Sequence, residues 1–397
     1  MKRTLTELLR CPETGSRLAL HVFAEAGGEV TEGVLVAADG RHWYPLTRSI
    51  PRLLPPELFP RGDFAAEHRR ELEQLGLKAE EALRGSRPSD GASPAKASPA
   101  TAHEGGGLIA MKQRTAESFT FEWREYQRFG WDDPTFDLER ERRVFLQKTV
   151  SAEADWAGAL TLDAGCGNGR YSYWAARFGA KVVAMDLSES VDGAYANTRG
   201  LDVHVVQGDI LRPPFAPETF ARVFSIGVLM HTGDARRATL SLCGLLAPGG
   251  ELSINLYGTG NPVYELNDRL VRRFTARMDR RDILRFTARM ARFADFCARH
   301  HLLNLVNAFI RLENHPHCIF DWYSAPVATH HSDGEVASWF RAGGLEVVAV
   351  ESGRPGSLNR AAGRLLGATA FRAGSSVRLL GRKPTVRGAE GEQRVDR

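Results

Sequence analysis

The sequence predicts an α/β protein with a doubly wound, mostly parallel sheet, a helical insertion and a small N-terminal β-rich unit. From residue 159 onward, short apolar runs alternate with segments of helix length, and such runs are typical of parallel strands covered on both faces. A turn with three glycines joins the first run to the next helix, which favours a ligand site at that helix N-terminus. Residues 85–107, poor in apolar side chains, divide this region from the N-terminal unit.

The N-terminal unit is expected to span residues 1–56. Its segment "EGVLVAADGRHWYPL" alternates apolar and polar residues as strands do, and a proline-rich stretch follows it. Residues 57–107 are expected to be a linker, helical as far as Arg84 and disordered from 85, where Ser, Pro, Ala and Gly leave almost nothing to bury. This linker is expected to separate two folding units.

The main domain is assigned to residues 108–383, and the polar residues 384–397 are expected to form a flexible tail. Its expected strands are the apolar runs at 159–164, 181–186, 202–209, 222–228, 251–257, 345–350 and 375–381. Helix-length segments lie between them, so the strands are expected to pair in parallel.

An arginine-rich stretch, residues 262–312, interrupts this alternation and contains the pentapeptide "FTARM" twice. It is expected to form a helical cap over the active site. One helical stripe of the cap is made of Ile283, Phe286, Met290 and Phe293. Its arginines either attract an acidic acceptor or solvate the outer face, and we favour the second interpretation.

Composition narrows the class of protein. A formal net charge of +4 over 397 residues is mild, so it favours neither a nucleic acid nor a membrane surface as partner. Arg10 and Glu13 interrupt the apolar residues of the N-terminus, unlike a signal peptide, and no apolar run reaches bilayer length. We therefore expect a cytoplasmic protein, and its five scattered cysteines favour reduced thiols.

The glycine loop lies in "LDAGCGNGRYS". A dinucleotide fingerprint needs its third glycine after two intervening residues, but Arg170 stands at that position because the glycines alternate. Asp163 just before the turn would repel a pyrophosphate and suits a ligand with an amino group. Both features favour S-adenosylmethionine over a dinucleotide.

Several motifs together carry a resemblance to a known family. The loop resembles the first motif of class I S-adenosylmethionine-dependent methyltransferases of the type 11 kind; "VVAMDLSES" and "VVQGDILRPPF" resemble the second and third, and later segments follow in the same order. The resemblance implies a seven-stranded Rossmann-like sheet and places Asp186 at the ribose and Asp209 at the adenine. The implied cofactor residues are Asp163, Ala164, Gly165, Cys166, Gly167, Asn168, Gly169, Asp186, Leu187, Asp209, Ile210, Ile226 and Gly227.

Candidate catalytic residues are His231, Asp321 and His330. His231 follows the fourth predicted strand, at the end where open α/β sheets bind ligands, and imidazole can accept a proton near neutral pH. Asp321 and His330 belong to "DWYSAPVATHH", and similar enzymes carry such a stretch over the substrate cavity. For each residue a structural role in a loop or turn is equally consistent with the sequence.

Two other patterns bear on the site. Residues His315, His317 and Cys318 in "ENHPHC" invite a metal, but no second ligand pair follows at a recognisable spacing, so no metal is predicted. An aromatic segment near the start of the main domain either closes over the cofactor or packs one face of a helix. That segment carries Phe119, Phe121, Trp123 and Tyr126.

The N-terminal unit resembles the zinc-ribbon partner domain that accompanies RNA and protein methyltransferases. The four knuckle positions of that family fall on Cys11, Thr14, Ala37 and Gly40. Because one thiolate cannot hold a tetrahedral zinc ion, we expect a metal-free ribbon that serves docking or stability.

The sequence therefore predicts an S-adenosylmethionine-dependent methyltransferase with a small molecule or biosynthetic intermediate as acceptor, methylated at oxygen, nitrogen or carbon. "SIGVLMHT" after the fourth strand differs from the Asn/Asp-Pro-Pro-aromatic signature of amino-directed nucleic-acid methylases, so a nucleic acid is not the expected substrate. An RNA or protein methyltransferase, and a cofactor-binding regulatory partner without activity, stay open as alternatives. A dehydrogenase is the weakest alternative.

Overall fold

The computed structural model describes residues 1–77, 104–131, 137–260, 262–275, 277–307, 309–352 and 376–385. The part of the expected linker from 78 to 103, which includes the end of the helix predicted as far as Arg84, and the expected tail from 386 onward lie outside these residues. Within the described residues, no helix combines the length and apolar character needed to cross a bilayer, and all five cysteines are free thiols.

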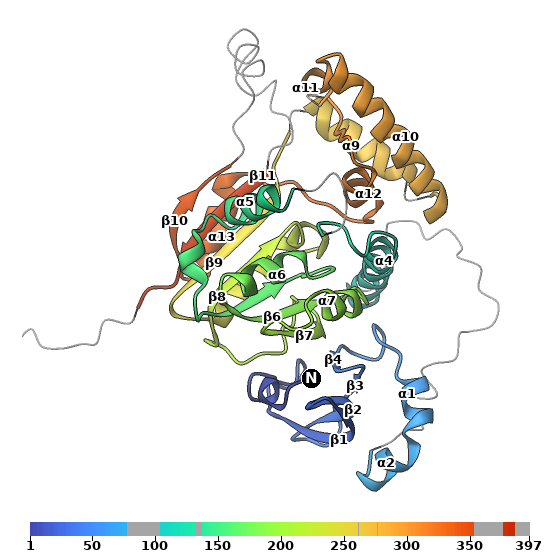
Figure 1. Ribbon diagram of the computed structural model, residues 1–397, viewed down its shortest axis with the longest axis vertical. Helices are drawn as coiled ribbons and strands as arrows, with labels where there is room; N and C mark the ends of the chain where they lie inside the picture. The colour runs from blue at the N-terminus through green and yellow to red at the C-terminus, as the bar shows by residue number, and fades with distance from the viewer. Residues whose placement is uncertain are drawn as a thin grey trace, which may run out of the picture.

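One eleven-stranded sheet crosses the described part of the chain, in the order β1-β2-β3-β4-β7-β6-β5-β8-β9-β11-β10 (Figure 1). The strands are β1 (Leu18–Ala26), β2 (Glu29–Ala37), β3 (Trp43–Thr47), β4 (Ile50–Leu53), β5 (Leu160–Ala164), β6 (Lys181–Asp186), β7 (Val203–Gly208), β8 (Phe220–Ile226), β9 (Leu246–Tyr257), β10 (Glu346–Val350) and β11 (Ser376–Arg382). Strands β4 to β9 pair in parallel along this order, whereas β11 is antiparallel to both neighbours. All seven predicted strands of the main domain are confirmed, but they form part of a larger sheet.

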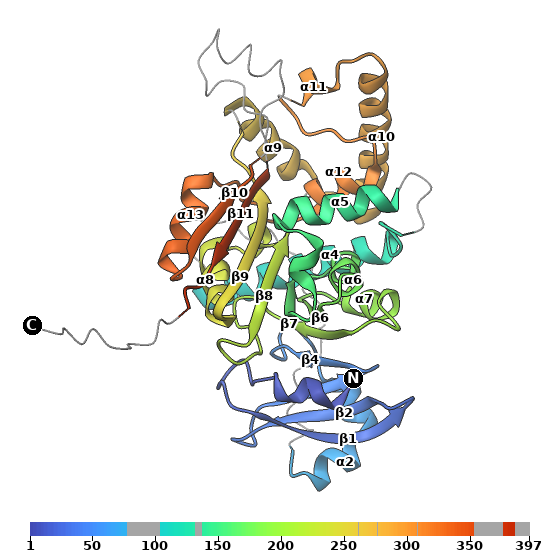
Figure 2. The ribbon, with the colours of Figure 1, turned by 60° about the vertical axis from the view of Figure 1, so that its left-hand side comes forward.

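Helices cover both faces of the main-domain sheet, so the doubly wound prediction is confirmed (Figure 2). On one face, α5 (Leu138–Thr149) and α6 (Arg170–Arg177) bury aromatic side chains against β6 and β8. On the other face, α8 (Ala235–Leu245) and α13 (Asp333–Ala342) pack against β8, β9 and β11. Helix α7 (Val191–Asn197) covers β6 and β7.

Polar caps fix where several of these helices begin. The side chains of Asp137, Asp234 and Ser332 accept hydrogen bonds from backbone N–H groups in the first turns of α5, α8 and α13, respectively. These caps satisfy donors that have no partner inside the helix. The local sequence therefore helps to set where these three helices begin.

The N-terminal unit is part of the same sheet, and the prediction of two separate folding units is wrong. Strand β4 pairs in parallel with β7, with Arg52 opposite Gln207 and Leu53 opposite Gly208. Met1, Leu5 and Leu9 share one apolar core with residues of the main domain. An uncovered β7 would present unpaired backbone groups, and β4 supplies their partners.

Arg52 stabilises the junction between the N-terminal unit and the main domain. Its side chain is completely buried, and its guanidinium lies 2.7 Å from a carboxylate oxygen of Asp192, 3.1 Å from the amide oxygen of Gln207 and 3.1 Å from Thr47 Oγ1. Burial lowers the pKa of Arg52, and Asp192 acts in the opposite direction. A buried guanidinium with these three partners ties β4 to α7 and β7.

The linker and the insertion differ in detail from expectation. The helical piece after residue 57 is two short helices, α1 (Gly62–Glu67) and α2 (Arg69–Gln74), and α4 (Glu104–Glu125) already begins inside the expected disordered segment. The insertion is helical as predicted, with α9 (Pro262–Thr275), α10 (Arg280–Arg299) and α11 (Leu303–Val306). Helix α12 (Pro316–Ser324) follows it, and the remaining short 3-10 helices are η1 (Arg3–Glu7), η2 (Glu153–Trp156) and η3 (Leu229–His231).

Replacing Arg52 with alanine is expected to lower the free energy of unfolding by about 3 kcal/mol, because it leaves Asp192 without its buried partner. Arg48 bonds to the same carboxylate at 3.1 Å but is 69% exposed, so Arg48→Ala should cost less than about 1 kcal/mol. Urea unfolding of both variants measures the difference. Equal decreases in the free energy of unfolding would contradict the conclusion that Arg52 stabilises the junction between β4, α7 and β7.

Candidate active site

The glycine loop between β5 and α6 takes a shape that only glycine supports at two positions. Gly165 has a φ of +96°, and a Cβ there would lie 2.4 Å from the side chain of Val228. Gly167 has a φ of +52°, and its Cβ would meet the ring of Trp123 at 2.9 Å. Neither position could therefore carry a side chain without displacing Val228 or Trp123, and the backbone of both glycines lines the cavity beside the loop.

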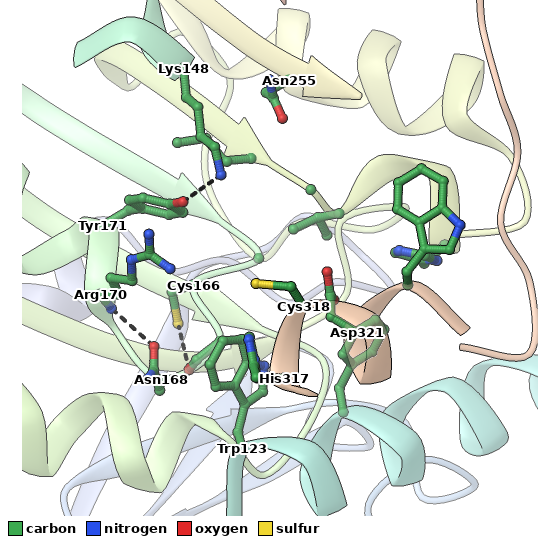
Figure 3. A pocket seen from close by; sticks show the side chains of 18 of the residues that line it. Trp123, Lys148, Cys166, Asn168, Arg170, Tyr171, Asn255, His317, Cys318 and Asp321 are labelled. Atoms are coloured by element: carbon green, nitrogen blue, oxygen red, sulfur yellow. Dashed lines mark hydrogen bonds between the residues drawn. The ribbon is translucent and has the colours of Figure 1, made fainter. Parts of the chain in front are cut away.

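A cavity of about 630 Å³ opens at the carboxyl ends of the central strands (Figure 3). Its wall contains ten of the thirteen predicted cofactor residues, namely Gly165, Cys166, Gly167, Asn168, Asp186, Leu187, Asp209, Ile210, Ile226 and Gly227. The other three are Asp163, Ala164 and Gly169, which lie outside this wall. A volume of this size is in the range of small-molecule sites.

Asp163 lies beneath the loop, where it anchors the following helix. Its carboxylate is 1% exposed and accepts a hydrogen bond from Ser172 Oγ at 2.6 Å. Burial raises the pKa of Asp163 to about 7. The predicted direct contact with an ammonium group therefore lacks support in the position of this side chain.

Two other acids stand at the strand ends. Asp186, at the end of β6, accepts hydrogen bonds from the backbone N–H groups of Gly167 and Ser188, each at 2.9 Å. Asp209, just after β7, forms an ion pair with Lys112 of α4. A ligand at this edge would thus meet two acceptor groups, one of them already paired with a lysine.

Helix α4 forms one part of the roof of the cavity. Its Phe119 and Trp123 line the cavity, whereas Phe121 and Tyr126 pack against Phe320 of α12, with ring centroids 5.9 and 6.2 Å apart. The aromatic segment therefore follows both predicted alternatives: two side chains face the cavity and two pack behind it.

His231 lies on the cavity wall in η3. Its Nδ1 is 2.6 Å from the carbonyl oxygen of Val327 and donates to it, while its buried Nε2 has no hydrogen-bond partner. Burial lowers the pKa of His231 to about 3. The imidazole is therefore neutral near pH 7, with a lone pair on Nε2 that can accept a hydrogen bond.

Asp321 of α12 also faces the cavity. Tyr257 donates a hydrogen bond to its carboxylate at 3.4 Å. Burial, and after it the nearby carboxyl of Glu122, raise the pKa of Asp321 to about 6. A carboxylate with such a pKa suits a general base at neutral pH.

His330 does not line the cavity, so the structure does not support its predicted catalytic role. Its Nδ1 lies 2.6 Å from Glu265 of α9, and its ring stacks on Trp322 with centroids 5.7 Å apart. Because Trp322 lines the cavity, His330 positions a residue of the wall from behind.

The sequence reasoning missed a buried pair in the roof, Glu122 of α4 and His317 of α12. Glu122 Oε1 lies 3.0 Å from His317 Nε2, and burial raises the pKa of Glu122 and lowers that of His317 to about 3. The His317 ring packs on Phe129 with centroids 3.8 Å apart. The sequence offered one signal for this pair, because Glu122 is an acid among the aromatic residues of "SFTFEWREY".

His315, His317 and Cys318 bring three potential metal-ligand atoms within 4.8 Å of one another. His315 Nδ1 caps α12 by accepting from the backbone N–H of His317 at 3.2 Å. Figure 3 shows Cys318 on the α12 side of the cavity and Cys166 on the glycine-loop side. The absence of a metal from this site stays a prediction.

Basic side chains stand around the outer part of the cavity. Lys148 of α5 donates to Tyr171 Oη at 2.7 Å, and Arg170 pairs with Glu141. Arg311 lies 4.0 Å above the ring of Trp322. Arg170, which stands where a dinucleotide fingerprint has its third glycine, thus forms an ion pair between α6 and α5.

The pKa of Asp163 makes stability depend on pH. Because the folded pKa of about 7 exceeds the value near 4 of an unfolded chain, the folded state binds this proton more tightly. The contribution of this proton to the free energy of unfolding is fully present below about pH 4. It is lost as the pH rises toward 7, by up to about 1.4 kcal/mol per pH unit. Asp163→Asn keeps an acceptor for Ser172 and is expected to remove this part of the decline.

Unfolding free energies of the parent and of Asp163→Asn at about pH 5 and about pH 7.5 test this expectation. Asp202→Asn, at a side chain that is half exposed and paired with Lys2, serves as the control and should follow the parent. A variant with the same pH dependence as the parent would refute the raised pKa of Asp163.

Comparison with known proteins agrees with the motifs. Residues 162–254 match a family described as a methyltransferase domain. A demethylmenaquinone methyltransferase of Thermobifida fusca is 38% identical over 121 residues, 30% of this chain and 51% of that protein. A ubiquinone biosynthesis O-methyltransferase of Xanthomonas euvesicatoria is 33% identical over 152 residues, 35% of this chain and 63% of that protein.

The chain thus spans less than two thirds of the length of these two relatives. Among solved structures, a putative sarcosine dimethylglycine methyltransferase of Galdieria sulphuraria is 13% identical, with a TM-score of 0.42 over 68% of this chain and 98% of that one. The family match covers β5 to β9, the strands whose ends form the cavity. Residues 162–254 are therefore similar to a methyltransferase domain.

Proposed function

We propose that this chain is an S-adenosylmethionine-dependent methyltransferase that transfers a methyl group to oxygen, nitrogen or carbon of a small-molecule acceptor. One observation carries the proposal: a single cavity joins the glycine loop and the strand-end acids to the polar side chains of α12. The cofactor half and the acceptor half of a transferase site must share such a space, because the methyl donor and the acceptor must meet in line.

The residues present fit this cofactor. Gly165 and Gly167 line the cavity without a side chain between their backbone and a ligand, and Asp186 offers a carboxylate to ribose hydroxyls. Ile210 and Ile226 give the wall an apolar part against which an adenine ring can lie. Asp209 can accept from an exocyclic amino group once Lys112 moves aside.

The chemistry needed from the protein is limited. Bound S-adenosylmethionine supplies a methyl group that is already activated. The residues of α4 and α12 exclude water from the acceptor and hold it in line. Asp321 takes the proton from an acceptor hydroxyl or amine, and the neutral His231 accepts a hydrogen bond through Nε2. Tyr257 orients the Asp321 carboxylate.

A cavity of about 630 Å³ favours a small acceptor over RNA or protein. Helices α4 and α12 lie over the strand ends, and large aromatic side chains of both line the cavity. The names of two relatives refer to demethylmenaquinone and to ubiquinone biosynthesis, so quinol and phenol acceptors are the first to try. We place the reaction in the cytoplasm.

The N-terminal unit is proposed to act as a fused, metal-free ribbon that stabilises the cofactor edge. Cys11, the one cysteine at a knuckle position, lies 3.3 Å from Tyr44 Oη inside the core. Strand β4 pairs with Gln207 and Gly208 of β7, the two residues directly before Asp209. This pairing would hold Asp209 in place at the end of the site where the adenine is proposed to bind.

Asp186→Ala is expected to weaken the binding of S-adenosylhomocysteine at least tenfold, because hydrogen bonds to a charged group contribute about 1.5–3 kcal/mol. Glu189→Gln changes an exposed carboxylate on the same loop and should leave affinity nearly unchanged. Calorimetric titration of the full chain measures both. Parent-like affinity in Asp186→Ala would refute the cofactor assignment.

Turnover is expected to fall as pH drops through about 6, since Asp321 must be ionised to accept a proton and its pKa is about 6. Asp321→Asn should lower kcat by about 100-fold with little change in cofactor affinity. Transfer of labelled methyl groups to a panel of quinols and phenols, followed from about pH 5 to about pH 8, measures the profile. An unchanged profile in Asp321→Asn would exclude this carboxylate as the base.

A further inference from the structure

The helical insertion has an inner and an outer surface. Its inner surface packs on α12, where Tyr264 of α9 and Ala291 of α10 join Ile319, Trp322 and Tyr323 in one apolar cluster. Both ribbon views place α10 at the edge of the molecule, far from the N-terminal unit (Figures 1 and 2). The insertion therefore joins the cavity wall to an outlying surface.

The outer surface is rich in apolar side chains. Of the twelve large apolar residues recorded as exposed in the described chain, nine fall between 263 and 309. Eight of them, each 43–57% exposed, are Val263, Leu266, Leu270, Phe274, Phe293, Phe296, Leu302 and Leu305. Of the predicted helical stripe, Ile283 is buried whereas Phe293 is exposed, and the buried side of α10 carries Ile283, Thr287, Ala291, Ala294 and Cys297. Such a concentration marks an interaction surface.

The same segment is strongly cationic. Residues 262–300 contain ten arginines and five acidic residues, a formal charge of +5, whereas the whole chain carries +4. Three of the acids pair with arginines of their own helix, in Asp268–Arg272, Asp282–Arg285 and Asp295–Arg299. Six further arginines lie on the outer surface: Arg269 and Arg292 are exposed, as are Arg273, Arg277, Arg281 and Arg289.

Apolar and cationic residues alternate on this surface. On α9, Arg269 and Arg273 stand between Leu266, Leu270 and Phe274. Arginine and phenylalanine are also common at protein interfaces, but two copies of a surface with a formal charge of +5 would repel each other. Interfacial helices combine arginines with phenylalanine and leucine in this way, because the guanidinium groups reach lipid phosphates while the apolar side chains enter the acyl boundary.

We propose that the outer surface of the insertion, formed by α9, α10 and α11, docks on an anionic lipid surface. Docking would place the membrane about one helix layer, roughly 10 Å, from α12. An acceptor dissolved in the lipid could then reach the cavity without crossing bulk water. Lipid docking goes beyond the proposed function and does not depend on it.

Flotation of the full chain with vesicles tests the proposal. We expect binding to vesicles of phosphatidylglycerol mixed with phosphatidylcholine, weakening with salt, and at least tenfold weaker binding to phosphatidylcholine alone. The double variant Phe293→Ser/Phe296→Ser should bind the anionic vesicles at least tenfold more weakly. Arg269→Gln/Arg273→Gln should weaken binding about fivefold per arginine.

Matched controls come from exposed residues of the same types elsewhere. Val348→Ser/Val350→Ser alters two half-exposed apolar side chains of β10, and Arg236→Gln/Arg237→Gln alters two exposed arginines of α8. Both controls should bind vesicles like the parent. Melting curves check that every variant is folded, and titration with S-adenosylhomocysteine follows the proposed function separately.

Absence of binding by the folded parent, or equal binding by insertion variants and controls, would overturn the proposal. A second result would also overturn it: the parent is dimeric by light scattering, the variant Phe293→Ser/Phe296→Ser is monomeric, and both bind vesicles equally. The surface would then join two copies of the chain. Vesicle binding without binding of S-adenosylhomocysteine would refute the proposed function and leave lipid docking supported.

Discussion

Parallel pairing of β5 with β6 and β8 is the constraint on which the rest of the site depends. Parallel register brings the carboxyl ends of these strands to one edge, so the glycine loop, Asp186 and η3 meet although they are far apart in sequence. Residues beyond strand ends need not satisfy the ladder, which leaves their backbone groups and side chains available to a ligand. The helices on both faces protect the strands and leave this edge open.

The roof over that edge has a different origin. Helix α4 lies between β4 and β5 in the chain and α12 follows the insertion, and their contact encloses Glu122, His317 and Asp321. Burying three ionisable groups costs free energy unless partners compensate, and Glu122 and His317 have side-chain atoms without a hydrogen bond. Because His317 and Asp321 line the cavity, a bound ligand could supply part of this compensation.

The N-terminal unit and the helical insertion are two additions to the main domain. They lie far apart and contact different elements. The N-terminal strands lengthen the sheet at β7 and end near Asp209, whereas the insertion rests on α12 and carries the cationic, apolar surface outward. Each addition thus touches one end of the cavity wall.

Local patterns in the sequence determined the seven strands of the main domain and the helical insertion, because strand and helix periodicity are local properties. The ten predicted residues on the cavity wall followed instead from the resemblance of the motifs to a known family. Sequence could not reveal that Asp163 lies beneath the loop, since its orientation depends on Ser172 one turn into α6. Nor could it separate His330 from the cavity: Trp322 stands between them only after α9 and α12 pack. The union of the N-terminal unit with β7 rests on Arg52 and Asp192, which are 140 residues apart. Which side of α10 is buried was likewise decided by packing, because both sides offer apolar residues and α12 covers one of them.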